Sequence, residues 1–237
     1  MSPRLKGSKS VKSDKTREHI YEAAMDLFQA QGFTDTTMRQ IAEKARVATG
    51  AAYYYFKTKN EIVLRFYKEL QAGDQAFLAS ADFQNTKNLE ERLKKLLSFK
   101  LDQLQAHRHF LDGVFRNAND PGSPLSPFSE ETRDIRESNI ANLRKAIEES
   151  NVTIDKRLKN RLPRLMWFYQ MGIILFWFYD RSPNQAKSRE LLDKSLKFIL
   201  LGTRFFGLPL LGPMRKVALE LLESFTVLLE KPAETRS

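Results

Sequence analysis

Apolar residues recur at helical spacing in one segment after another along this chain of 237 residues. Ile20, Ala24, Leu27 and Phe28, for example, fall on one face of a helix. No segment shows the strict alternation of apolar and polar residues that a half-buried β-strand requires. The pattern predicts an all-α fold of about nine to ten helices, with a three-helix helix-turn-helix head at the N-terminus and a larger helical bundle behind it.

Positive charge is concentrated at the start of the chain. The sequence has 39 Lys and Arg against 29 Asp and Glu, and residues 1–17 hold six of the basic residues but one acidic residue. Serines interleave with these lysines, which favours a flexible basic arm over residues 1–14. The net charge of +10 suits a polyanionic partner such as nucleic acid, and the alternative is a tail that only keeps the chain soluble.

Several classes of protein are excluded by what the sequence lacks. Cysteine is absent, so the chain has no disulfide, thiolate metal site or cysteine nucleophile. No apolar run reaches the ~20 residues that span a bilayer, and no secretory signal is visible. His107 and His109 do not face each other on a helix, so they and Asp112 make a poor metal site. We therefore expect a cytoplasmic protein that is not an enzyme, uses no cofactor or metal and does not enter a membrane.

After the arm and a first long helix, the sequence predicts two short helices joined by a tight turn. The first long helix is expected to end at Gly32, Thr36 or Thr37 to cap a short second helix, and Thr49 to begin a third segment. This is the geometry of a helix-turn-helix, whose second helix enters the major groove of DNA while its first crosses the backbone. We place this head in residues 15–60.

The third segment combines a core side with an outer side suited to DNA. Ala52 and Phe56 share one face, so the step of about 100° per residue turns the opposite face outward. The outward residues are small, phenolic and basic: Gly50, Ala51, Tyr53, Tyr54 and Lys57. Small residues let the backbone approach base edges, and phenol and lysine groups reach phosphates. Lys59 begins the next helix, where its charge and the free N–H groups can meet a phosphate together. The alternative is an aromatic core stripe, although four consecutive aromatic residues cannot all face one core.

The first quarter of the chain resembles the TetR-type bacterial transcriptional regulators. The resemblance covers residues 15 to about 65, and the matching stretches are Gly32-Phe33, Thr36 to Ala42, Val47, Gly50, Tyr53 to Phe56 and Lys57 to Ile62. It implies a homodimer in which the head over residues 15–60 binds a double-stranded DNA operator. The body over residues 61–237 then senses a ligand and forms the dimer.

The resemblance also implies roles for single residues. Thr37 and Lys59 correspond to phosphate contacts. Base reading is implied for Thr49, Gly50 and Ala51, and contacts with phosphate and thymine methyl groups for Tyr53, Tyr54 and Tyr55. Arg46 stands where the family usually has glycine, so the turn must accept a side chain, which could be a further phosphate contact. Ala48 replaces the usual capping serine, and Thr49 could take over that cap at the expense of base reading.

The body continues the helical pattern. One helix is expected from Leu89 to Phe115, and the prolines and glycine of residues 117–128 predict a break after it. Two strongly apolar helices are expected over residues 163–180 and 191–206. A short loop joins the apolar pair, so they should pack antiparallel and form a four-helix bundle with the same hairpin of a second subunit. The expected interface residues are Phe176, Phe198, Leu201, Gly202 and Phe205. A final helix over residues 214–230 is the alternative interface.

An apolar pocket is a further expectation for the body. Aromatic and methionine side chains suit adaptable apolar ligands, and the candidates are Phe99, Phe115, Trp167, Tyr169, Gln170 and Met171. The alternative is that these side chains are plain core. The favoured function is a sequence-specific DNA-binding regulator, a repressor that a small apolar or amphipathic effector releases from its operator. The alternative function is a ligand-independent dimer that acts as an architectural or partner-controlled factor.

Overall fold

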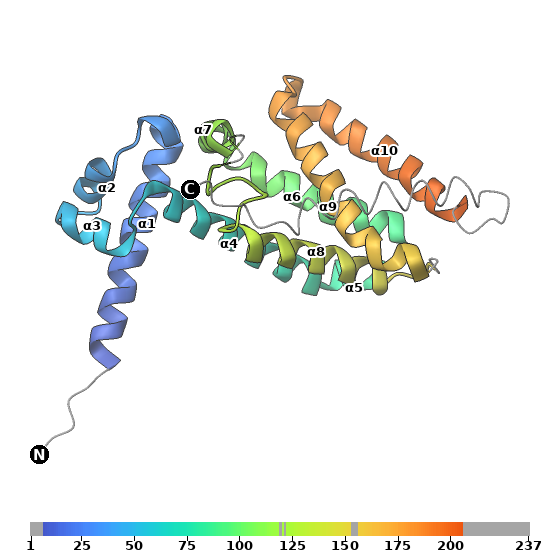
Figure 1. The fold of residues 1–237 in the computed structure, drawn as a ribbon, viewed down its shortest axis with the longest axis horizontal. Helices are drawn as coiled ribbons and strands as arrows, with labels where there is room; N and C mark the ends of the chain where they lie inside the picture. The colour runs from blue at the N-terminus through green and yellow to red at the C-terminus, as the bar shows by residue number, and fades with distance from the viewer. Residues whose placement is uncertain (1–6, 119, 121, 153–155, 206–237) are drawn as a thin grey trace, which may run out of the picture. The chain divides into compact units, whose positions relative to one another are not determined.

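The computed structural model describes residues 7–118, 120, 122–152 and 156–205, and over these residues it contains ten α-helices and no strand (Figure 1). The helices are α1 (Gly7–Asp35), α2 (Met38–Lys44), α3 (Thr49–Tyr55), α4 (Lys59–Ala79), α5 (Ala81–Asn85), α6 (Leu89–Gln105), α7 (Arg108–Ala118), α8 (Arg133–Glu148), α9 (Lys156–Tyr179) and α10 (Ala186–Phe205). The prediction of an all-α fold is confirmed. No helix within the described ranges is both long enough and apolar enough to cross a bilayer.

The chain divides into two compact units. The head unit comprises Met1–Lys68 and Ala106–Glu131, and the body unit comprises Glu69–Gln105 and Thr132–Ser237. Besides the residues of the predicted head over 15–60, the head unit contains α7 and the first half of α4. The reason is aromatic packing: Phe110 on α7 stacks on Phe28 of α1, with ring centroids 5.2 Å apart, and meets Phe66 of α4 at 5.1 Å.

The single helix expected from Leu89 to Phe115 is two helices. A turn at residues 106 and 107 separates α6 from α7, and each has its own partners. In the body unit α6 packs against α8 and α10, whereas in the head unit α7 packs along α1. Gly113 supports the second contact, because a Cβ at that position would lie 3.3 Å from the Cβ of Phe33. Tertiary partners thus break a segment whose local periodicity is continuous.

The start of α1 also differs from expectation. The arm predicted to be flexible over residues 1–14 is helical from Gly7 onward. The lysines and serines after Gly7 are not interrupted by proline or glycine, so nothing in the sequence stops a helix there. The Oγ atom of Ser13 lies 3.3 Å from the hydroxyl oxygen of Tyr55, which connects this part of α1 to α3.

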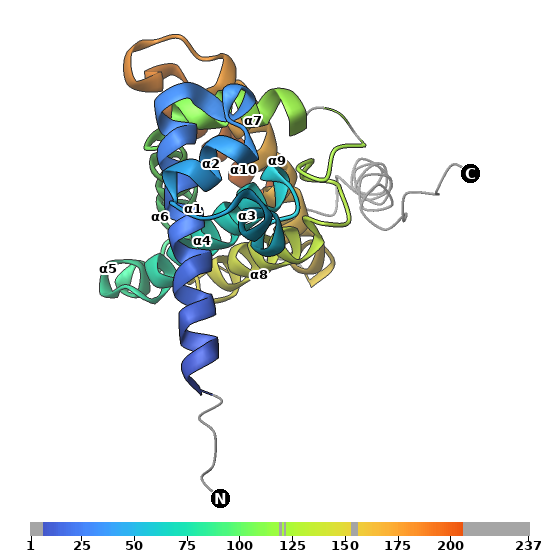
Figure 2. The same cartoon turned by 90° about the vertical axis from the view of Figure 1, so that its left-hand side faces the viewer.

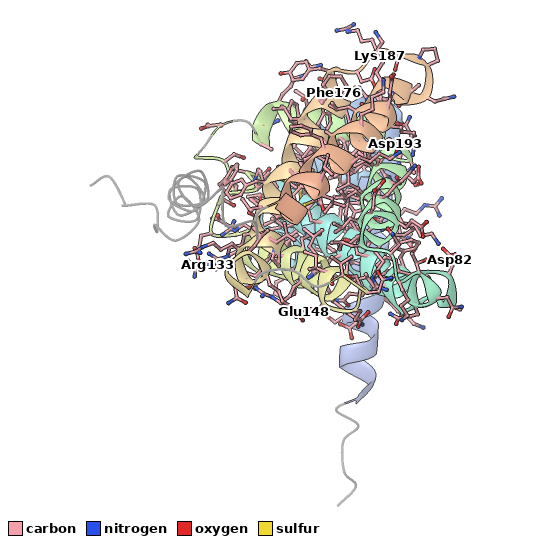
Figure 3. All side chains as sticks on the ribbon, turned by 90° about the vertical axis from the view of Figure 1, so that its right-hand side faces the viewer. Asp82, Arg133, Glu148, Phe176, Lys187 and Asp193 are labelled. Carbon is pink, nitrogen blue, oxygen red and sulfur yellow. The ribbon has the colours of Figure 1, made fainter. Side chains whose placement is uncertain are left out.

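In the body unit a buried arginine fastens α6 to its neighbours. Arg92 is fully buried, and its Nε donates to the carbonyl oxygen of Ala146 on α8 at 2.8 Å. Its Nη1 donates to the carbonyl oxygen of Thr86 at 2.8 Å, and its Nη2 pairs with Glu149 at 2.7 Å. On the other side of α6, Lys94 pairs with Asp193 of α10 at 2.9 Å (Figure 3). These contacts fix α6 between α8 and α10.

The helices α9 and α10 form a hairpin, as the sequence predicts. Asp180 closes it: one carboxylate oxygen accepts hydrogen bonds from the N–H and hydroxyl of Ser182 at 2.9 and 2.6 Å, and the other accepts from those of Ser188 at 2.8 and 2.7 Å. Burial alone would raise the pKa of Asp180, but these four hydrogen bonds hold it well below its usual range. The alternative interface over residues 214–230 lies outside the described residues.

Candidate nucleic-acid interface

Helix α2 begins with a complete side-chain cap. The Oγ1 of Thr37 accepts from the N–H of Gln40 at 3.2 Å, and the N–H of Thr37 donates to Oε1 of Gln40 at 2.8 Å. Thr36, the other candidate cap, is buried and its hydroxyl donates to the carbonyl oxygen of Gly32 at 2.8 Å. Gly32 itself has φ of 85°, a left-handed conformation that interrupts α1 at the residue where the sequence predicts its end.

The turn between α2 and α3 contains an arginine in a left-handed conformation. Arg46 has φ of 52°, its N–H donates to the carbonyl oxygen of Glu43 at 3.0 Å, and the next N–H, that of Val47, donates to Ala42 at 3.0 Å. This conformation costs a non-glycine residue about 1–2 kcal/mol. The turn therefore accepts a side chain where glycine is usual, and it leaves that side chain exposed beside α3.

Helix α3 begins without a side-chain cap. Its N-cap residue is Ala48, which offers no hydrogen bond, and Thr49 is the first residue of the helix. The alternative that Thr49 caps α3 is therefore wrong, and its exposed side chain remains available. The inner face is as expected, because Ala52 and Phe56 are buried.

The outer face of α3 is open. Tyr54 is 73% exposed and Tyr53 46% exposed, so these two tyrosines are not part of a core stripe. A Cβ at Gly50 would meet no atom within 4 Å, and Lys57 is also exposed. Ala51 and Tyr55 are half-buried. Helix α3 packs against α2, and α2 packs against α1, so the exposed face of α3 belongs to a supported helix (Figure 2).

Tyr55 has a different environment from its neighbours. Its ring meets that of Tyr54 edge to face, with centroids 5.1 Å apart, and its hydroxyl lies beside Ser13. Arg17 of α1 places its guanidinium 5.4 Å from the ring of Phe56. The sequence does not predict this place for Arg17, which lies just after the predicted arm, because only the fold brings α1 to this position.

Lys59 is engaged within the head unit. Its Nζ donates to the carbonyl oxygen of Phe33 at 2.6 Å and to that of Thr34 at 3.3 Å, and it lies 4.5 Å from the centre of the Phe33 ring. Burial lowers the pKa of Lys59, and the charge of Asp35 opposes that shift. The expected phosphate-binding ammonium thus holds the carbonyl groups at the end of α1 in this structure.

Both helices of the α9–α10 hairpin expose large apolar residues. Phe198 is 79% exposed and Tyr179 69%, and Leu175 and Leu201 are exposed as well. Phe176, on α9, is also exposed (Figure 3). A Cβ at Gly172 or at Gly202 would meet no atom within 4 Å. Four of the five predicted interface residues are on this surface, and the side chain of Phe205 lies outside the described residues. Leu175 and Tyr179 were missed because α9 is apolar on every side.

The six candidate pocket residues have different surroundings, and a shared pocket stays a prediction. Trp167 and Gln170 are buried, whereas Met171 is half-exposed and the hydroxyl of Tyr169 is 2.8 Å from Oγ of Ser195 and donates to the carbonyl oxygen of Leu192. Phe115 belongs to α7 in the head unit. Phe99 stacks on Phe77 of α4, with ring centroids 4.2 Å apart. A buried ion pair between Asp74 and Lys100, which the sequence does not predict, lies next to that stack.

Comparisons with known families and proteins agree with this architecture. Residues 20–66 match the family model of bacterial regulatory proteins of the tetR family, and residues 92–207 match a tetracyclin repressor-like C-terminal domain. The chain is 43% identical over 54 residues to the HTH-type transcriptional regulator SrpR of Pseudomonas putida, which is 23% of this chain and 25% of SrpR. It is 27% identical over 111 residues to the HTH-type transcriptional repressor NicS of Pseudomonas putida, which is 47% of this chain and 52% of NicS. These matches thus span from a quarter to about half the length of the curated relatives.

Solved structures share the fold. FadR of Thermus thermophilus, a TetR-family repressor solved in complex with lauroyl-CoA, superposes with a TM-score of 0.58 at 23% identity, over 76% of this chain and 93% of FadR. A TetR transcriptional regulator from Nitrosomonas europaea gives a TM-score of 0.57 at 18% identity, over 77% of this chain and 96% of that protein. At these identities the likeness concerns the arrangement of the helices.

Proposed function

Because the chain belongs to the tetR family of bacterial regulatory proteins, which are DNA-binding regulators of transcription, we propose that it is a homodimeric repressor released from its operator by a small apolar or amphipathic effector. The observation that carries the proposal is the outer face of α3. Tyr53 and Tyr54 are exposed there although large aromatic residues are usually buried, and Gly50 leaves the helix backbone uncovered.

This face has the chemistry of a groove-binding helix. An α-helix fits the major groove, and a bare backbone at Gly50 allows a closer approach to base edges than a larger side chain would. The hydroxyls of Tyr53 and Tyr54 and the charge of Lys57 supply donors for phosphate oxygens. Arg46 adds a positive charge at the turn that precedes α3. The bare backbone at Gly50 would thus face the bases, and the hydrogen-bond donors of the surrounding side chains would face the phosphates.

The surface of the α9–α10 hairpin supports the proposed homodimer. Large exposed apolar patches usually mark interaction sites, and this one contains Phe176, Phe198 and Leu201. Two hairpins would pair as a four-helix bundle with twofold symmetry. The two copies of α3 would then read half-sites about 34–36 Å apart, one turn of DNA.

The effector is the finer part of the proposal. FadR of Thermus thermophilus was solved in complex with lauroyl-CoA, and FadR of Bacillus subtilis in complex with stearoyl-CoA; both share this fold, which supports an amphipathic effector. A molecule that favours one arrangement of the body helices changes operator affinity by the difference in its affinity for the two arrangements, typically 1–3 kcal/mol. We therefore expect the effector to bind the body unit.

Selection from a random-sequence duplex pool tests the proposal. The wild-type chain should enrich an inverted repeat and bind it as two chains per duplex. Tyr53→Phe should weaken binding, whereas Tyr169→Phe, which also removes one hydroxyl but in the body unit, should not. Phe198→Asp should reduce dimerisation and operator affinity together, and Ala141→Asp, on an exposed position of α8, serves as its control. A pool in which no motif is enriched would contradict the proposal.

A further inference from the structure

Two helices of the body unit meet along a polar seam. The second half of α4 and the C-terminal half of α6 run antiparallel, and three contacts join them in order. The Nε2 of Gln103 donates to the carbonyl oxygen of Leu70 at 3.1 Å, the Nζ of Lys100 donates to Oδ2 of Asp74 at 2.5 Å, and the ring of Phe99 stacks on that of Phe77. We call these six residues the α4–α6 seam.

The seam contains two buried acceptor atoms that receive no hydrogen bond from the described residues. Asp74 is 1% exposed, and its Oδ1 accepts no hydrogen bond from the part of the chain that the structure describes. The same holds for Oε1 of Gln103, although its Nε2 is used. Buried polar atoms without a partner are rare in folded proteins, because each forfeits the hydrogen bonds that it makes to water. Both atoms need a donor.

The ion pair itself is not explained by stability. Burial raises the pKa of Asp74 and lowers that of Lys100, and the attraction between them opposes both shifts. Replacing a buried ion pair by apolar residues of similar size is often neutral or stabilising. A carboxylate with one free oxygen, held in place by a lysine, therefore serves better as a binding group than as a packing element.

We propose that the α4–α6 seam is the effector site, and that the effector is a neutral, mainly apolar molecule whose hydroxyl or amide N–H groups donate to Oδ1 of Asp74 and Oε1 of Gln103. This inference rests on the proposed function and adds the chemical class of the effector. An effector with a carboxylate group has no proton to donate to these two acceptors. An effector with an ammonium group would be repelled by the charge of Lys100. The stacked rings of Phe77 and Phe99, less than one helical turn farther along α4, offer contact to the apolar part.

The position of the seam suits a sensor. α4 is one continuous helix that begins at Lys59 in the head unit and reaches Asp74 in the body unit. Gly73 lets the two helices approach closely at the seam, because a Cβ at this residue would lie 2.3 Å from Nε2 of Gln103. The carboxamide of Gln103 thus crosses α4 through space that only glycine leaves. A donor that engages Gln103 acts directly on the contact between the two helices.

Four probes with the same alkyl chain test the chemical class: decan-1-ol, decanamide, decanoate and decylammonium. Thermal unfolding of the full-length wild-type chain is measured with each. At about ten times their Kd, the alcohol and the amide should raise Tm by about 3–5 °C. Decanoate and decylammonium should raise Tm by less at equal concentration. Equal shifts with all four probes, or none with the alcohol and the amide, would overturn the proposal.

Paired variants then place the site. Asp74→Leu combined with Lys100→Met removes the acceptor together with its charge partner, so the fold is retained while the response to alcohol and amide should be lost. Asp82→Leu combined with Lys95→Met removes an ion pair of the same type, 2.7 Å apart between α5 and α6, in which Asp82 is exposed and Lys95 half-buried. This variant should leave the response unchanged. Gln103→Leu should weaken the response without removing a charge. A response that survives in the first double variant contradicts the inference.

Operator binding in the same samples separates the two proposals. If the wild-type chain binds its selected duplex but the seam variants respond to the probes as it does, the seam inference fails and the proposed function stands. If the wild-type chain selects no duplex, the proposed function fails, and with it the role of the seam as an effector site.

Discussion

Replacing Arg46 by glycine should stabilise the head unit and weaken DNA binding at the same time. Arg46 has φ of 52°, in the left-handed region, and its side chain is exposed. The backbone bonds of the turn, from Arg46 to Glu43 and from Val47 to Ala42, do not involve the side chain and are kept in the variant. The substitution therefore changes conformational strain and charge but not packing.

The size of the stability gain follows from two opposing terms. A left-handed conformation costs a residue with a Cβ about 1–2 kcal/mol, which glycine does not incur. Glycine has a more flexible unfolded state, which costs about 0.5–1 kcal/mol. The difference predicts that Arg46→Gly is about 0.5–1 kcal/mol more stable than Arg46→Ala, which removes the same side chain and keeps the strain. In an ordinary helical position the order would be reversed, with alanine better by about 1 kcal/mol.

Urea unfolding of both variants and of the wild-type chain measures this difference. Salt titration of operator binding measures the other consequence, because the loss of one phosphate contact should reduce the salt slope by about 0.9 in both variants. If Arg46→Gly is less stable than Arg46→Ala, the turn does not hold residue 46 in the left-handed conformation. An unchanged salt slope would mean that the exposed guanidinium does not contact DNA.

Three further substitutions test the local contacts. Thr37→Ala removes the capping box of α2 and should lower the free energy of unfolding by about 1 kcal/mol in urea titration, and an unchanged midpoint would argue against the cap. Lys59→Met removes the hydrogen bonds to the carbonyl oxygens of Phe33 and Thr34 and should lower the free energy of unfolding by about 1–2 kcal/mol. If the variant instead lost operator affinity at unchanged stability, Lys59 would bind phosphate rather than hold these carbonyl groups. Asp180→Asn should lower the free energy of unfolding by an amount that is constant from neutral pH down to about pH 5 and shrinks below about pH 4. The reason is that the pKa of Asp180 is lower in the folded than in the unfolded chain, where it is about 3.9. The ionised carboxylate therefore stabilises the fold above that value, and this contribution is lost as pH falls towards the folded-state pKa. If the difference in unfolding free energy between the wild-type chain and Asp180→Asn grew as pH fell, the carboxylate of Asp180 would not stabilise the fold as described.

The parts of the fold that the sequence predicts are those set by near neighbours. The cap at Thr37 depends on Gln40 three residues away, and the burial of Ala52 and Phe56 depends on a spacing of four. The interruption of α1 at Gly32 is likewise local. Short-range rules suffice for such features because the partner is fixed by the helix itself.

The parts that the sequence does not predict depend on distant partners. The break between α6 and α7 follows from Phe110 finding Phe28, which is far away in the chain. Lys59 finds the carbonyl oxygen of Phe33 because α4 begins beside the end of α1. In the seam, the charged residue Lys100 sits among the leucines of α6, and its value as a binding group becomes visible only when Asp74 is placed opposite it.

Gly50→Ala tests directly whether the outer face of α3 contacts DNA. A methyl group at this position meets no atom of the protein within 4 Å, and alanine favours a helix over glycine by up to about 1 kcal/mol. The measurement is the Kd of the variant for the duplex selected by the wild-type chain, taken with its free energy of unfolding. We predict a chain that is at least as stable as wild type and binds the duplex at least tenfold more weakly, because the methyl group enters the groove first. A variant that is equally stable and binds as tightly as wild type would contradict the account.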